Sequence, residues 1–163
     1  MIDNSTLEKL EYKKVLQRIS NYAVTEPGKN LILNLLPLID HKKILKEGNS
    51  VNEAKEILIK NNPPQLEFLP ELEDSLSKSK IEGSVLPSKT ILDVYKLAAS
   101  SRKLKNYLTD KKEDVIILFE SSSKLFADKV FEHHIEKVIN ENGEIKEKCL
   151  IPKTLLSYRE KTS

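Results

Sequence analysis

The apolar residues of this 163-residue chain recur at steps of three and four positions. That is the period of an amphipathic helix with one buried face. The first 23 residues show it most clearly, at Leu7, Leu10, Val15, Leu16, Ile19, Tyr22 and Ala23. Glycine occurs only four times and strand-like runs are short, which excludes sandwiches, barrels and doubly wound sheets. The sequence therefore predicts an all-α fold.

Capping residues divide this pattern into separate helices. Ser5 and Glu8 stand in capping-box spacing, and Thr25, Asp40, Ser88 and Asp128 each precede an apolar-periodic run. We expect helices over residues 5–23, 26–36, 41–60, 71–79, 88–108, 113–124 and 129–139. The third of these has a weak point at Gly48, because glycine destabilises a helix interior.

The predicted helices form one irregular multi-helix core domain over residues 1–150. Residues 63–70 are expected to be extended and packed on the surface, since Leu66, Phe68 and Leu69 need burial. At most a minor strand pair is expected near residues 143–150. Pro152 opens a further helix over residues 151–163, which we interpret as the start of a truncated longer helix.

Charge and cysteine content limit the classes of partner. The net charge is +2, from 27 basic and 25 acidic residues, and arginine occurs only three times. Lysine binds phosphate as a point charge, so any nucleic-acid contact would be to the backbone and sensitive to salt. A single cysteine excludes an internal disulfide, and no signal peptide or membrane span is present. A cytoplasmic protein is expected, with no membrane partner.

The densest basic stretch surrounds Tyr107. Its members are Arg102, Lys103, Lys105, Lys111 and Lys112. These side chains could contact a phosphate backbone, but acidic residues follow at once and a single aromatic is no stacking platform. A solvated helix face is the favoured interpretation.

Other candidate sites lack the partners that their chemistry requires. Gly28 and Lys29 precede a helix without the remaining residues of a phosphate-binding loop. His133 and His134 are adjacent, so on a helix they point about 100° apart and cannot share a metal. His134 is expected at the edge of the core and His133 on the polar side. Cys149 lacks a neighbouring base, and Ser121–Ser123 lack a nucleophile elbow. We therefore expect no catalytic, cofactor-binding or metal site.

Several segments, taken in their order along the chain, resemble the second bacterial MutS family (MutS2). The segments are Leu7–Tyr12, Val15-Leu16, Asn21–Ala23, Gly28-Lys29, Pro37 to Asp40, Asn52–Ala54, Gly83 to Leu86, Arg102–Lys105 and Ile139–Ile145. Their order and spacing match the family over nearly the whole chain. At Lys148–Pro152 the chain departs from the Ala-Ser-Pro-x-Leu helix opening of that family.

This resemblance implies a helical core segment followed by the first turns of a lever helix. Family members continue into a clamp-like coiled coil, a dimerising ATPase that uses ATP and Mg²⁺, and often an Smr endonuclease. They are associated with branched DNA, suppression of recombination and rescue of collided ribosomes. The expected role is non-catalytic coupling of the ATPase to the clamp. The alternative is a self-sufficient helical module that binds nucleic acid or protein through residues 102–112.

Overall fold

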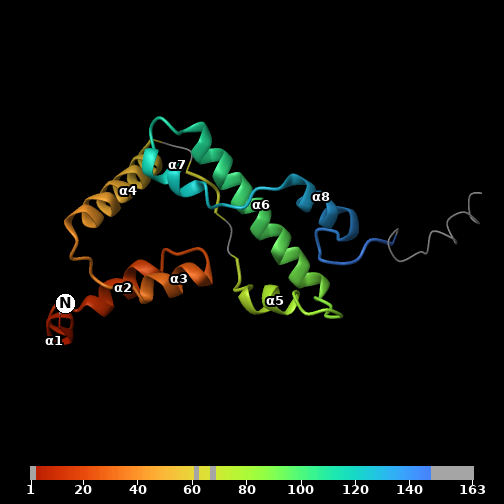
Figure 1. The fold of residues 1–163 in the computed structure, drawn as a ribbon, viewed down its shortest axis with the longest axis horizontal. Coiled ribbons are helices and arrows are strands. Elements are labelled where there is room, and N and C mark those ends of the chain that lie inside the picture. The colour runs from red at the N-terminus through yellow and green to blue at the C-terminus, as the bar shows by residue number, and fades with distance from the viewer. Residues whose placement is uncertain (1–2, 61–62, 67–68, 148–163) are drawn as a thin grey trace, which may run out of the picture. The chain divides into compact units, whose positions relative to one another are not determined.

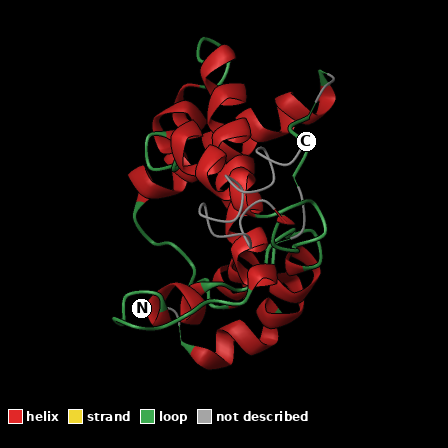
Figure 2. Cartoon of the chain, turned by 90° about the vertical axis from the view of Figure 1, so that its right-hand side faces the viewer, coloured by secondary structure: helices red, strands yellow, loops and turns green. Residues whose placement is uncertain are grey.

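The computed structural model describes residues 3–60, 63–66 and 69–147. These residues form α-helices joined by turns and loops, and no strand is found among them (Figures 1 and 2). The predicted all-α class is confirmed. An isolated antiparallel bridge between Ile139 and Ile145 lies where a minor strand pair was expected, and a parallel bridge joins Thr25 to Leu69. No described helix is long and apolar enough to cross a membrane.

The chain divides into two compact units. Unit 1 comprises Met1–Glu71 and Ser100–Ala127, and unit 2 comprises Leu72–Ala99 and Asp128–Ser163. Helix α6 (Ser88–Asp110) supplies residues to both units. Residues 148–163 lie outside the described part, so the division into a 1–150 core and a 151–163 helix stays a prediction.

Unit 1 contains five complete helices and the second part of α6. The five are α1 (Asn4–Lys9), α2 (Tyr12–Ser20), α3 (Glu26–Leu33), α4 (His41–Ile59) and α7 (Ile116–Ser122). Helices α2 and α3 pack against each other, and α4 packs against α7 (Figure 1). Leu16, Leu69, Leu108 and Val115 are buried in this unit.

The first predicted helix is in fact two helices, and its cap is different. Asp3, not Ser5, accepts the backbone N–H of Thr6 at 2.7 Å. Glu11 then adopts left-handed backbone angles, with φ 52°, which ends α1 and starts α2 in a new direction. The apolar stripe continues across this break, which is why periodicity alone predicted a single helix.

The next two caps are confirmed. The Thr25 hydroxyl accepts from Gly28 N at 3.1 Å, and the Asp40 carboxylate accepts from Lys43 N at 3.0 Å. Helix α3 ends at Leu33, three residues earlier than predicted, and the side-chain amide of Asn34 donates to the Asn30 carbonyl at this end. Helix α4 runs through Gly48 without interruption.

Unit 2 contains α5 (Glu73–Lys78), the first part of α6, and α8 (Lys129–Val138). Asp128 caps α8 by accepting from Val130 N and Phe131 N, as predicted. Gly143, with φ +79°, forms the turn that brings Ile145 beside Ile139. Leu72, Ala98, Ala99 and Ile139 are buried in this unit.

The buried face of α8 differs from the predicted one. His134 is exposed rather than at the edge of the core, and Glu132 is only 5% exposed. Phe131 and Ile135 are half-buried, so the covered face is rotated away from His134 and toward Glu132. The extended segment is also only partly as expected. Leu69 is buried, Leu66 is 52% exposed, and Phe68 lies outside the described residues.

Candidate functional site

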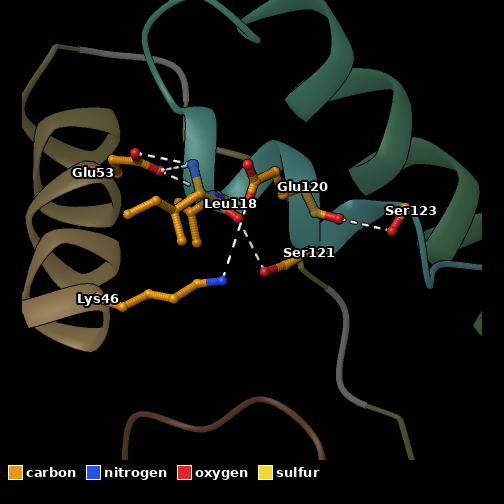
Figure 3. A network of polar contacts seen from close by, with 7 residues as sticks. Lys46, Glu53, Leu118, Glu120, Ser121 and Ser123 are labelled. Atoms are coloured by element: carbon orange, nitrogen blue, oxygen red, sulfur yellow. Dashed lines mark hydrogen bonds and ion pairs between the residues drawn. The ribbon is translucent and has the colours of Figure 1, made fainter. Parts of the chain in front are cut away.

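A long-range polar contact in unit 1 joins α4 to the start of α7. The two carboxylate oxygens of Glu53 each accept from Ile117 N at 3.0 Å, and Oε2 also accepts from Leu118 N at 2.9 Å. Figure 3 shows the carboxylate of Glu53 directed from α4 to these amides. The residue before α7, Val115, has no capping side chain of its own. Glu53 therefore acts as the cap of a helix that begins 63 positions later.

Electrostatics explain why a carboxylate suits this position. The first N–H groups of a helix lack partners within the helix, and its N-terminus carries partial positive charge. Glu53 is half-buried, which limits competition from water. A second pair, Lys46 Nζ to Glu120 Oε2 at 3.9 Å, is well exposed and contributes little stability (Figure 3). The Glu53 contact is thus the principal polar tie between the two helices.

A further tie holds the segment that follows α7. Lys105 on α6 donates from Nζ to the carbonyl of Leu125 at 3.2 Å. Val115, directly before α7, is only 1% exposed. In unit 1, α7 and its flanking segments are therefore anchored to α4 at one end and to α6 at the other. We call the contacts of Glu53 with Ile117 and Leu118, together with the contact of Lys105 with Leu125, the α7 tie.

The five predicted phosphate-contact residues have different surroundings in the structure. Arg102 and Lys103 are engaged in interactions within the chain, and Lys105 belongs to the α7 tie. Lys111 lies over the ring of Tyr107, with Nζ 5.4 Å from its centroid, and Lys112 is exposed in the turn after α6. Whether any of the five contacts phosphate stays a prediction.

His41 belongs to unit 1, whereas His133 and His134 are adjacent residues of unit 2. His133 and His134 are both exposed on α8, and His41 is the first residue of α4. His133 Nδ1 lies 3.9 Å from Glu136 Oε2, which is a charge pair only when the imidazole is protonated. The described residues contain no group of three His, Cys, Asp or Glu side chains suited to a metal ion.

The remaining candidates are used locally or lie beyond the described part. Gly28 N–H is capped by Thr25, and Lys29 pairs with Glu26 at 2.6 Å. The hydroxyls of Ser121–Ser123 donate to carbonyls three or four residues earlier, at the end of α7. Figure 3 shows the bonds of Ser121 and Ser123. Cys149 lies outside the described residues.

Unit 2 contains an open cleft of about 580 Å³ beside α8. Its polar groups already serve the fold. Tyr95 Oη donates to Glu136 Oε1 at 2.6 Å, and Lys146 Nζ donates to the carbonyl of Glu136 at 2.5 Å. These bonds join α6 and the strand-like arm after Gly143 to α8. Tyr95, Glu136 and Lys146 thus hold part of the cleft lining in place.

Comparison with curated proteins decides the family. The chain is 30% identical over 154 residues, 90% of its length, to Endonuclease MutS2 of Halothermothrix orenii. It is 35% identical over 66% of its length to Endonuclease MutS2 of Caldicellulosiruptor saccharolyticus, and 27% identical over 90% to that of Symbiobacterium thermophilum. The chain belongs to the MutS2 family. No family model matches it.

The matches cover most of this chain but only a small share of each relative's length. The chain spans 19%, 14% and 18% of the three MutS2 relatives. The resemblance drawn from the sequence is thereby confirmed for the family. In the sequence, Glu53 is visible only as part of the Asn52–Ala54 match to the family. Its role as a cap was invisible, because its partners lie more than sixty positions away.

Proposed function

We propose that this chain is a non-catalytic helical support within a longer MutS2 protein. In that protein it couples the nucleotide state of an ATPase to a clamp that closes on branched DNA. The observation that carries the proposal is the α7 tie. One carboxylate accepts hydrogen bonds from two backbone N–H groups, at 2.9–3.0 Å, and so holds together two helices that are distant in sequence.

Such a tie suits a part that transmits force. Polar contacts at fixed geometry resist sliding between helices more than apolar contacts do, because a hydrogen bond weakens steeply when its angle or length changes. The charged acceptor strengthens the bonds further. A displacement of α4 would therefore carry the start of α7 with it.

The interactions that residues of the basic stretch make within the chain also favour a supporting role over independent DNA binding. Four of its five residues interact within the chain, and Lys112 is the remaining one. Backbone phosphate binding needs several cations presented together to solvent. The relatives carry the name endonuclease, and we assign nuclease and ATPase chemistry to parts of the longer protein outside this chain.

The experiment compares two glutamates of α4 in the longer protein. Glu53→Ala removes the Glu53 part of the α7 tie, whereas Glu56→Ala removes only a surface pair with Lys60 at 3.2 Å. We expect Glu53→Ala to keep basal ATP hydrolysis and lose most of its stimulation by branched DNA. Glu56→Ala should leave both unchanged. The same pair, assayed with collided ribosomes, shows whether ribosomes rather than DNA engage the clamp.

Two results would contradict the support role. One is full DNA stimulation in the Glu53→Ala protein. The other is tight binding of branched DNA, without ATP, by the 163-residue chain alone in a gel-shift titration. The second result would instead favour the self-sufficient binding module.

A further inference from the structure

Helix α4 has a covered face and an apolar uncovered one. Glu53 and Lys46 point from it toward α7 (Figure 3). Val51 lies about 160° around the helix from Glu53, at 100° per residue. Ile44 and Leu58 stand seven positions before and after Val51, on the same side. The side chains of Ile44, Val51 and Leu58 are 46%, 68% and 66% exposed, so the described residues leave much of this side of α4 open to solvent.

The positions between them complete a helix-packing pattern. Ile44, Gly48, Val51, Lys55 and Leu58 are separated by four, three, four and three residues, which is the spacing of a coiled-coil seam. We call these five residues the α4 seam. A helix packed on the seam would contact an apolar side chain at every second seam residue, namely Ile44, Val51 and Leu58.

Gly48 adds an independent indication of a partner. A Cβ at this position would meet nothing within 4 Å. Glycine weakens a helix interior relative to alanine, and no packing in the described residues explains its presence. On a seam, however, glycine lets a neighbouring backbone approach closely.

Lys55 indicates the charge of that partner. It forms no ion pair among the described residues. Covering the seam would remove part of its ammonium group from water, which is costly without an opposite charge. The partner helix should therefore present a carboxylate to Lys55.

The length of the seam decides where the partner comes from. From Ile44 to Leu58 the seam is about 21 Å long, at 1.5 Å per residue. Two heptads with glycine and lysine in the core are too short to hold a second, free chain at micromolar concentration. A helix in the same polypeptide is supplied at an effective concentration of about millimolar. The MutS2 relatives are about five times longer than this chain, since it spans 19% of the first of them.

We propose that the α4 seam is the docking site for an amphipathic helix of the same MutS2 polypeptide, outside these 163 residues. That helix carries apolar residues at seam spacing and an acidic residue opposite Lys55. The inference rests on the proposed function in one respect, namely that the chain is part of a longer protein.

Thiol labelling tests the seam directly. Val51→Cys and, as a matched control, Asn49→Cys are prepared in the 163-residue chain and in the longer protein. Asn49 is exposed on α4 and lies about 160° from Val51. Maleimide modification is followed by mass spectrometry of the α4 peptide, so other cysteines do not interfere.

In the 163-residue chain we expect the two thiols to react at rates within about twofold. In the longer protein, the thiol at position 51 should react at least about tenfold more slowly while that at position 49 keeps its rate, because a docked helix exposes the seam only by local opening. Val51→Asp, with Asn49→Asp as control, gives a second measure. It should lower the melting temperature of the longer protein and leave that of the 163-residue chain unchanged.

Equal reactivity at position 51 in both proteins, with no effect of Val51→Asp, would overturn the proposal. Protection that appears in the 163-residue chain and grows with its concentration would also overturn it, because the occupant would then be a second copy. Failure of the proposed function has a different signature. The seam would be protected in the longer protein, while Glu53→Ala left ATPase stimulation intact.

Discussion

Tyr107 illustrates how one polar atom can work against the fold. Its hydroxyl oxygen is buried and has no hydrogen-bond partner among the described residues. Burial also raises its pKa above the ordinary value of 10.0. A hydroxyl that is buried without a hydrogen-bond partner lowers the free energy of unfolding, because its bonds to water are lost and not replaced. Removing it leaves the ring and its contact with Lys111 in place.

We therefore expect Tyr107→Phe to raise the free energy of unfolding by about 1 kcal/mol. Urea denaturation of the 163-residue chain measures the change. Tyr22→Phe is the control, because Tyr22 is 87% exposed and its hydroxyl is solvated. A loss of stability on Tyr107→Phe would mean that the hydroxyl has a partner in solution.

Asp3 makes the first helix sensitive to acid. Hydrogen bonds to its carboxylate, first from Thr6 N–H and then from the hydroxyls of Ser5 and Thr6, hold its pKa below 3.8. A lowered pKa in the folded state means that the stabilisation is present above the unfolded pKa and is lost as the pH falls through the folded value.

We expect α1 to fray below about pH 3.8, as followed by NMR chemical shifts of its backbone. Helix α3, capped by the neutral Thr25 hydroxyl, should show no such step from its cap. Asp3→Asn should flatten the profile of α1, since asparagine caps without titrating. An unchanged profile in that variant would assign the transition to another group.

At the scale of elements, the break between α1 and α2 contains stored strain. Glu11 has φ 52°, a left-handed conformation that costs a residue with a side chain about 1–2 kcal/mol. Glu11→Gly should therefore raise the free energy of unfolding by about 1 kcal/mol, despite losing an exposed ion pair with Lys14. Glu8→Gly, within α1, should lower it by about 1 kcal/mol. Thermal unfolding of both variants checks the opposite signs.

On the uncovered side of α4, replacing a glycine rather than introducing one should stabilise the chain. Gly48→Ala should raise the free energy of unfolding of the 163-residue chain by about 1 kcal/mol, because the added methyl meets no neighbour. Gly83→Ala is the matched control and should be destabilising, since Gly83 has φ +81°. In the longer protein, a docked helix should reduce or reverse the gain from Gly48→Ala. No gain in the short chain would show that position 48 is already covered.

These elements also show what could be predicted from sequence. The caps at Thr25, Asp40 and Asp128 were found because cap and amide lie within three residues of each other. The α1–α2 break was missed because glutamate carries no signal for left-handed angles. The α8 face was misplaced because tertiary contacts, not periodicity, decided that Glu132 rather than His134 is buried.

The candidate site was less predictable than the fold. The basic stretch was visible as composition, yet the position of Lys105 against Leu125 depends on a contact across twenty residues. The tie from Glu53 spans more than sixty. Local spacing carries no information about such pairs, so a support role could be inferred from family resemblance but not located on particular residues.

At the scale of the whole molecule, the two units predict two regions of separate stability. The α7 tie lies wholly within unit 1, and the bonds around Glu136 lie wholly within unit 2. Proteins open in cooperative regions whose amides exchange together. Removing a contact in one region should therefore act first on that region.

We expect Glu53→Ala to speed hydrogen exchange in α4, α7 and residues 100–127, and to leave residues 128–147 at their original rates. The bond from Lys146 N–H to the Val138 carbonyl, at 2.8 Å, is a reporter for unit 2. Ile139→Ala, at a buried position of unit 2, should produce the opposite pattern. Exchange that rises equally everywhere in both variants would mean that α6, which contributes to both units, couples them into one cooperative whole. In that case a substitution in α4 would raise exchange rates throughout the described chain, and its effect would not be limited to the elements joined by the α7 tie.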